Sequence, residues 1–465
     1  MKKYLFSVFI ASLLAPSSAF AYGEGSTIPY ESRVMHLLTN EVRTDVHTAI
    51  DACGKNCHEG KHCYERSYKA LYWDDNLYKA ATFHANMLAT LTPPKWGCIQ
   101  HPSPCQLVDN FASLFPDKCD GNPSCACKTG KATCDTQGTR MGIRVTQFGT
   151  QSAAENIVAN TKVDPYEMFY MLFNEDSTAD VKSQCGFTHN NGHRVNILAD
   201  NQSFVGIGLS NMIAVQDFGR TYEQVPIQPI SSGSHYTDDK GTLYFKMHYD
   251  AKVKVQATAL TLGPKCIALK WAKGNNYRGI WSTKSDNNID PCTPYFYEAI
   301  DTEGNITRYP TTGALLYNCK YSWTNKTDNL YQGCINAVAN GSIDNNGSDN
   351  NNGSDNNNGS NNNNGSDNNN GSDNNNGSDN NNGSDNNNGA DNNNGSDNNI
   401  NSNNNNNNTY PSGSGSTRAA GDDDSDLDFD CAANVYRPAN NSLWLILSFI
   451  PLGYIARRNR NMTRK

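Results

Sequence analysis

The chain has 465 residues, a hydrophobic fraction of 37% and a formal net charge of −8 at pH 7. This length allows two or three domains, and the negative charge lies mainly in a repeat tract and in the aspartate cluster 422–430. The rest of the chain is close to neutral and shows no basic stripe, which argues against binding to nucleic acid.

The first 21 residues have the pattern of a secretory signal peptide. Lys2 and Lys3 precede the apolar run Leu5–Leu14, and an Ala-Phe-Ala motif ends at Ala21. We expect cleavage between Ala21 and Tyr22 and export of the remainder. The alternative is a short anchor that is never cut.

Residues 26–222 form a first globular segment, in which helical patterns precede strand patterns. Apolar residues recur at helical spacing in 32–50 and in 76–91, and short β-type runs follow at 204–210 and 212–219. This order predicts an α+β fold or a three-layer sandwich.

Residues 227–339 form a second segment of a different character. Runs of β-branched and aromatic residues, such as TLYFKMHY and KVKVQATALTL, alternate with Gly, Asp and Asn clusters. This pattern predicts a small antiparallel β-sandwich of about seven strands.

Residues 340–430 are dominated by an NNGSDN repeat that runs from about 344 to 399. Such a composition cannot bury a core, so we expect a disordered linker. The repeat is not an EF-hand array, because Gly falls in the wrong position and the terminal Glu is absent. A spacer function and a neutral repeat expansion both remain open.

Residues 431–465 have the pattern of a C-terminal sorting or transmembrane tail. Cys431 precedes an apolar stretch at 443–456 and a final basic block. The stretch is shorter than a comfortable membrane span, while the basic block is typical of a stop-transfer signal. The arrangement resembles bacterial C-terminal sorting tails of the CTERM type, which implies processing or lipidation at Cys431. A plain membrane anchor is the alternative, and either one predicts a protein at the cell surface or released from it.

The cysteines favour disulfide bonds. Ten lie between Cys53 and Cys185, four more lie in the second segment, and Cys431 is left over. Even numbers in an exported chain are typical of disulfides. The closely spaced run Cys119, Cys125, Cys127 and Cys134 imitates a zinc cluster, but export favours disulfides there too.

Five short motifs give the first segment a family resemblance. In chain order they are NEVR at 40–43, LYWDDNLYKAATFHANMLA at 71–89, AENI at 154–157, GHRVNIL at 192–198, and the strand pair VGIGLS and AVQDFG. Together they resemble the CAP superfamily of cysteine-rich secretory, antigen 5 and pathogenesis-related 1 proteins, including the bacterial SCP-like proteins. The resemblance implies an α-β-α sandwich. Members of the family are implicated in metal, sterol or lipid binding, and a few in proteolysis.

The family's cavity is lined by two histidines and two acidic residues. His193 matches the Gly-His-Arg motif, and His101, which follows the alanine-rich helix, is the best match for the other histidine. His84 lies inside that helix and matches less well. His189 is four residues before His193, but the intervening Asn-Asn-Gly favours a turn, so we expect a surface residue there.

The two acidic positions match less evenly. Glu155 corresponds to the glutamate of the family's Gly-Glu-Asn motif, with Ala in place of Gly. Glu175 corresponds to a Trp-x-x-Glu motif in which Leu replaces Trp, and Asp176 is the alternative. An insertion from 176 to 191 separates this position from the His193 motif.

Two imidazoles and two carboxylates that face one cleft would suit Zn²⁺ or another divalent cation, with His101 and His193 as the metal ligands. We therefore predict an exported, envelope-anchored protein that binds a small ligand, a lipid or a metal ion. The alternatives are a structural His/Glu cluster, a metal-assisted hydrolase of peptide or envelope substrates, and an adhesin-like protein in which the β-sandwich carries recognition.

Overall fold

The computed structural model describes residues 28–91, 99–134, 138–176, 185–187, 191–220, 228–285 and 288–343. The predicted signal peptide, nearly all of the predicted linker and the whole of the predicted tail lie outside these residues, and so does His189. Within the described residues, no helix is long and apolar enough to cross a membrane.

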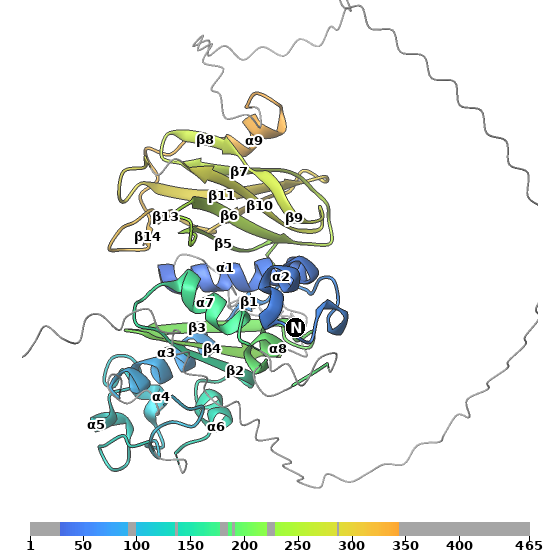
Figure 1. Cartoon of the computed structure of the whole chain (residues 1–465). Helices are drawn as coiled ribbons and strands as arrows, with labels where there is room; N and C mark the ends of the chain where they lie inside the picture. The colour runs from blue at the N-terminus through green and yellow to red at the C-terminus, as the bar shows by residue number, and fades with distance from the viewer. Residues whose placement is uncertain are drawn as a thin grey trace, which may run out of the picture. The chain divides into compact units, whose positions relative to one another are not determined.

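The first segment is an α+β fold around one four-stranded sheet (Figure 1). Its strands are β1 (Tyr72–Trp73), β2 (Ser152–Ala159), β3 (Phe204–Ser210) and β4 (Ile213–Gly219), in the order β1-β3-β4-β2. β1 runs parallel to β3, and the other pairs are antiparallel. Its helices are α1 (Tyr30–Thr44), α2 (Val46–Cys53), η1 (Gly54–Asn56), η2 (Lys61–Cys63), α3 (Asp75–Ala89), α4 (Phe111–Leu114), α5 (Pro123–Ala126), α6 (Met141–Thr146), α7 (Pro165–Phe173) and α8 (Gly192–Leu198).

Helices cover both faces of this sheet, as the three-layer prediction requires. Successive strand residues point to opposite faces, so Ile157 and Val215 pack with the alanines of α3, whereas Val158 and Phe218 join the core under α1, α7 and α8. The apolar cores on the two faces of the sheet both follow from the spacing of apolar residues in the helices and strands.

Two glycines of the VGIGLS motif allow α3 to lie directly on the sheet. A Cβ atom on Gly206 would come within 2.0 Å of the Tyr78 backbone nitrogen, and one on Gly208 within 2.2 Å of the Thr82 nitrogen. α3 itself starts where the Asp74 carboxylate accepts hydrogen bonds from the first backbone N–H groups. The motif thus sets the distance between the helix and the sheet.

The second segment consists of two antiparallel sheets around a shared core. The first has the order β5-β6-β10-β9, and the second has the order β14-β13-β11-β7-β8 with β12 beside β11. The strands are β5 (Ile230–Thr237), β6 (Leu243–Asp250), β7 (Val255–Leu262), β8 (Lys265–Ala268), β9 (Lys270–Gly274), β10 (Arg278–Ser285), β11 (Pro294–Asp301), β12 (Ile306–Tyr309), β13 (Ala314–Leu316) and β14 (Trp323–Thr324). Phe245 and Tyr249 of one sheet meet Leu260 and Tyr297 of the other in the core.

The strand count exceeds the predicted seven for identifiable reasons. The run CIALKWA, which reads as one strand, divides at Leu269: β8 pairs with β7 in one sheet, and β9 pairs with β10 in the other. Three short strands, β12 to β14, add to the count. The segment also ends in a short helix, α9 (Cys334–Ala339), which an all-β interpretation omits.

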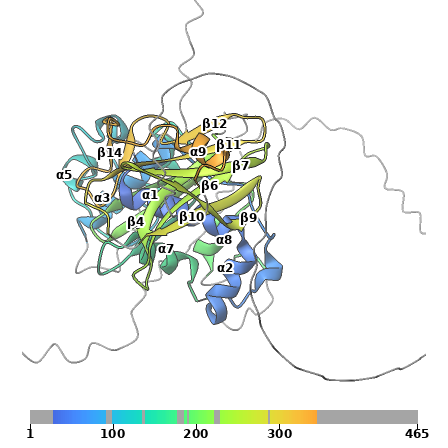
Figure 2. The same ribbon diagram turned by 90° about the horizontal axis from the view of Figure 1, so that it is seen from above.

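The first sheet of the second segment packs against α1, as the adjoining layers in Figure 1 show, and Figure 2 looks down on this stack from above. Asn40 of α1 donates hydrogen bonds to the hydroxyl groups of Ser231 and Ser232. Glu41 accepts from Lys246 at 2.9 Å and forms an ion pair with Lys273 at 2.8 Å. α1 is therefore buried between two sheets, and nearly all of its residues are inaccessible to solvent.

The preference for disulfides over zinc is confirmed in the described residues. Six bridges join Cys53–Cys57, Cys63–Cys185, Cys105–Cys127, Cys119–Cys125, Cys266–Cys334 and Cys292–Cys319. Cys134 is also disulfide-bonded. All four cysteines of the run that imitates a zinc cluster are thus oxidised.

Candidate functional site

His101 and Glu155 form the first pair of predicted site residues. His101 lies in the loop after α3, and its Nδ1 is 2.9 Å from Glu155 Oε1 on β2. The Glu155 side chain is completely buried, whereas that of His101 keeps about a fifth of its surface exposed. With an ionised Glu155 as the acceptor, the proton of this bond belongs to Nδ1.

Arg144 on α6 holds both members of this pair. Its guanidinium is buried, forms an ion pair with the Glu155 carboxylate, and donates to the His101 carbonyl oxygen at 2.8 Å. Burial alone would raise the pKa of Glu155, but Arg144 and the nearby imidazoles His84 and His101 outweigh it and lower the pKa to about 2. Glu155 is therefore ionised at neutral pH.

His193 and Glu175 form the second pair. His193 is the second residue of α8, and its Nδ1 is 2.7 Å from Glu175 Oε2 just beyond α7. The backbone N–H of Arg194 donates to the other Glu175 oxygen at 3.1 Å. Both Glu175 oxygens are thus engaged, and His193 Nε2 has no hydrogen-bond partner among the described residues.

Both pairs approach consecutive residues of β2, an edge strand of the sheet. Glu155 carries the first pair on the face of α3. Asn156 points to the opposite face, where its Nδ2 donates to the His193 carbonyl oxygen at 3.1 Å and its Oδ1 accepts from Asn196 at 2.9 Å. The AENI and GHRVNIL motifs are therefore joined by hydrogen bonds, and the two pairs flank the same strand.

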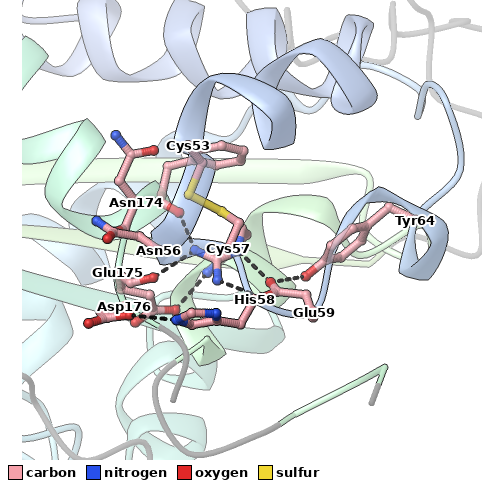
Figure 3. Close-up of a disulfide and its surroundings, with 11 residues drawn as sticks. Cys53, Asn56, Cys57, His58, Glu59, Tyr64, Asn174, Glu175 and Asp176 are labelled. Carbon is pink, nitrogen blue, oxygen red and sulfur yellow. Dashed lines mark hydrogen bonds and ion pairs between the residues drawn. A yellow bond between two sulfur atoms is a disulfide. The ribbon is translucent and has the colours of Figure 1, made fainter. Parts of the chain in front are cut away.

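The loop closed by the Cys53–Cys57 disulfide, and the residues just after it, lie beside the segment 174–176 that carries Glu175 (Figure 3). Buried Glu59 accepts from the Arg194 guanidinium at 2.6 and 3.1 Å and from the Tyr64 hydroxyl at 2.9 Å. His58, next to Glu59, lies with its Nε2 3.6 Å from a carboxylate oxygen of Asp176. The alternative acidic residue Asp176 thus faces His58, while Glu175 is the partner of His193.

Sequence reasoning missed two members of the first cluster. Asp217 on β4 lies opposite Glu155 in the strand register and is completely buried, with no hydrogen-bond donor on either oxygen. Burial and the charge of Glu155 raise the pKa of Asp217 well above its usual range. Arg144 was missed because nothing in RMGIRV marks a buried arginine. For Asp217, the available signal was a carboxyl group on the apolar face of AVQDFG.

The less well matched histidine, His84, lies in the same buried cluster. Its Nε2 is 3.0 Å from the Gln100 carbonyl oxygen, and its Nδ1 is buried without a partner. Burial, followed by the charge of Arg144, lowers the pKa of His84 to about 3. His84 is therefore neutral at physiological pH and lies close enough to His101 and Glu155 to interact with both electrostatically.

The geometry bears on how a metal ion would bind. Among the described residues, the only group of three or more His, Cys, Asp or Glu donors within 4.8 Å of one another is His62, Cys63 and Cys185. The four predicted residues form no such group. A carboxylate that holds Nδ1 of a histidine typically orients it toward a metal at Nε2, so each imidazole has the chemistry of a Zn²⁺ ligand and each glutamate that of its hydrogen-bond partner.

Comparisons with known proteins add little to this picture. No protein-family model and no curated protein matches the chain. One solved structure, the crystal structure of an extracellular protein containing an SCP domain from Bacillus anthracis str. Ames, aligns with 19% identity over 37% of this chain and 39% of that chain, with a TM-score of 0.20.

Proposed function

We propose that the chain is an exported CAP-type protein held at the cell envelope, and that His101 and His193 contact a small ligand, a lipid or a divalent cation such as Zn²⁺. One observation carries this proposal: both imidazoles are held through Nδ1 by a buried carboxylate. This arrangement directs each Nε2 lone pair away from its glutamate and fixes the ring orientation.

The residues divide into two roles in this proposal. His101 and His193 would hold a metal ion, and such an ion would polarise a bound water or a carbonyl group of a ligand. Glu155 and Glu175 keep the two rings in one tautomer. Arg144 keeps Glu155 ionised, so the first ring stays oriented over the whole neutral pH range.

The same orientation supports a hydrolase as the second candidate. An imidazole whose Nδ1 is held by a carboxylate is also a general base at Nε2. Cysteine nucleophiles are not available in the described part of the site, because the cysteines there are oxidised. A hydrolytic reaction would therefore use an activated water.

Native mass spectrometry with elemental analysis on the full chain tests the proposal. We expect wild-type protein loaded with Zn²⁺ to retain a metal ion that His193→Ala loses, while its circular dichroism stays unchanged. His47→Gln is the matched control, because the His47 Nε2 contacts only the Tyr64 carbonyl oxygen among the described residues. Wild-type protein with neither metal nor lipid bound after loading would rule the proposal out.

Turnover separates the two candidates. If the protein is a hydrolase, His101→Ala and His193→Ala each abolish cleavage of peptide or envelope substrates by a folded chain. If it is a binding protein, wild type shows no turnover, and both variants lose the bound ligand.

A further inference from the structure

A second set of metal-type donors lies outside the site described above. The ligand atoms of His62, Cys63 and Cys185 all lie within 4.8 Å of one another. His62 and Cys185 are exposed, and Cys63 is half-buried. His62 Nε2 is 3.6 Å from Cys63 Sγ. The two sulfur atoms are joined in a disulfide, so neither is a thiolate in this state.

This disulfide ties the start of α8 to a distant loop. It links η2 to the short segment 185–187, across a sequence separation of 122 residues. In that segment the Gly186 carbonyl oxygen accepts a hydrogen bond from Asn191 at 3.1 Å, and Asn191 immediately precedes α8. The disulfide therefore restrains the segment that precedes α8, the helix that carries His193.

This bridge combines an exposed position with a neighbouring histidine. Cys105–Cys127 and Cys266–Cys334 are buried at both ends, and Cys53–Cys57 and Cys119–Cys125 are buried at one end. Cys292–Cys319 matches it in exposure, with one exposed and one half-buried cysteine. Cys63 Sγ, however, contacts a histidine nitrogen, whereas the structure shows no such contact for Cys292 or Cys319 among the residues it describes.

We propose that the Cys63–Cys185 disulfide is the reducible bridge of this protein, and that its two thiolates together with His62 form a binding site for Zn²⁺ or a similar borderline divalent cation. The donor set is Cys₂His, which soft and borderline metals prefer, with the fourth position left to water. This site is separate from the His101 and His193 pairs and does not depend on their function.

The redox step balances with a dithiol as the reductant. A thiolate of the dithiol attacks the exposed Cys185 sulfur, the S–S bond breaks, and Cys63 leaves as a thiolate. The second thiol of the reagent then closes on the mixed disulfide and releases Cys185, so the reagent ends as a cyclic disulfide that has lost two electrons. When the metal binds, both cysteines are present as thiolates, and their two protons pass to solvent.

His62 contributes to both parts of this proposal. A neighbouring imidazole stabilises a thiolate, and a stabilised thiolate is a faster leaving group in disulfide exchange. After reduction the same imidazole supplies the third metal ligand. An exposed bridge without an imidazole lacks both advantages.

The first arm of the test measures which bridge opens. The full chain is titrated with a dithiol, alkylated and mapped by peptide mass spectrometry, with Cys292–Cys319 as the internal control. We expect Cys63 and Cys185 to be labelled at reductant concentrations that leave Cys292 and Cys319 oxidised, and His62→Gln to slow that labelling several-fold. Simultaneous opening of both bridges, or an unchanged rate in His62→Gln, would overturn the proposal.

The second arm measures the metal. Co²⁺ added to the partly reduced, folded chain should give a thiolate-to-cobalt charge-transfer absorption that the oxidised chain and a Cys63→Ser/Cys185→Ser variant both lack. Because this band requires thiolates, cobalt at the His101 and His193 pairs does not produce it. We expect His62→Gln to weaken Co²⁺ binding by at least about tenfold, the lower end of the loss seen when a supporting group of a metal site is removed. Absence of the band in reduced wild-type protein would contradict the metal site.

Discussion

Replacing Glu41 by Gln should destabilise the protein strongly and change how its stability depends on pH. Glu41 lies on α1, and its carboxylate is buried between the ammonium groups of Lys246 and Lys273. Burial alone would raise the pKa of this carboxyl group, but the two lysines outweigh it and lower the pKa from 4.5 to about 2. Glutamine keeps the size of the side chain and removes the charge.

The size of the effect follows from linkage between protonation and folding. A lowering of the pKa from 4.5 to about 2 corresponds to about 3 kcal/mol of stability, at about 1.4 kcal/mol per pH unit. Because the pKa is lowered in the folded state, this contribution is complete above pH 4.5 and is lost as the pH falls toward 2. Removing one partner of a buried ion pair costs about the same, roughly 3–5 kcal/mol.

Urea unfolding of the full chain at a series of pH values tests this. At pH 7 we expect Glu41→Gln to lower the free energy of unfolding by about 3 kcal/mol, and the gap to wild type to shrink as the pH falls below 4.5. Glu167→Gln is the control, since the Glu167–Lys162 pair is on the surface and exposed pairs contribute only about 0–1 kcal/mol. A Glu41→Gln protein as stable as the control, or a gap that stays constant with pH, would refute the reasoning.

Three further predictions concern the sheet and the two pairs. Gly206→Ala should lower the free energy of unfolding by about 1–3 kcal/mol or more in urea titration, because its methyl group would overlap the backbone of α3; an unchanged midpoint would contradict the close packing. Glu175→Gln should weaken Zn²⁺ binding by about 10- to 100-fold in competition with a chelating indicator, because His193 loses its anionic partner; equal affinity would mean that this pair does not serve a metal. Asp217→Asn should become more stable relative to wild type as the pH rises above 4, because the folded wild-type protein loses stability when a carboxyl group with a raised pKa has to ionise beside Glu155. Thermal melting from pH 5 to 8 measures the difference in melting temperature, and a difference that changes in the opposite direction would contradict a protonated Asp217.

The sequence predicted α3, β3, β4 and a helix over 32–50 because each shows local periodicity, and the structure divides the last of these into α1 and α2 at Asp45. The alanine-rich stripe of α3 and the alternation in β3 and β4 are visible in the residues themselves. The motif at 192–198 also identified His193 as a candidate site residue, although its place in a helix was not predicted. What periodicity could not supply was the partner of each imidazole, since Glu155 and His101 come together only through the path of an irregular loop.

The packing around α1 lay beyond sequence reasoning for a different reason. Asn40 and Glu41 belong to the NEVR motif, which carries a family resemblance but gives no sign that a second segment buries both side chains. In the structure the second segment covers them and satisfies them with hydroxyl and ammonium groups. Burial of polar residues by a distant sheet leaves no periodic signature. The division of CIALKWA between two sheets was hidden similarly, because both halves have the same strand-like composition.

The contact between α1 and the second segment also bears on the order of events during synthesis. The ribosome makes α1 and the first sheet before Lys246 and Lys273 exist. On the α1 side, Asn40 and Glu41 present an amide and a carboxylate to this contact, and water can solvate both groups while translation continues. These two positions of the nascent first segment can therefore stay hydrated until the second segment is made, which also adds Tyr236 and Ile280 to the apolar core around α1. Completion of the second segment then withdraws the Glu41 carboxylate from water and fixes it between two lysines, so the last part of the globular chain to be made stabilises the first helix.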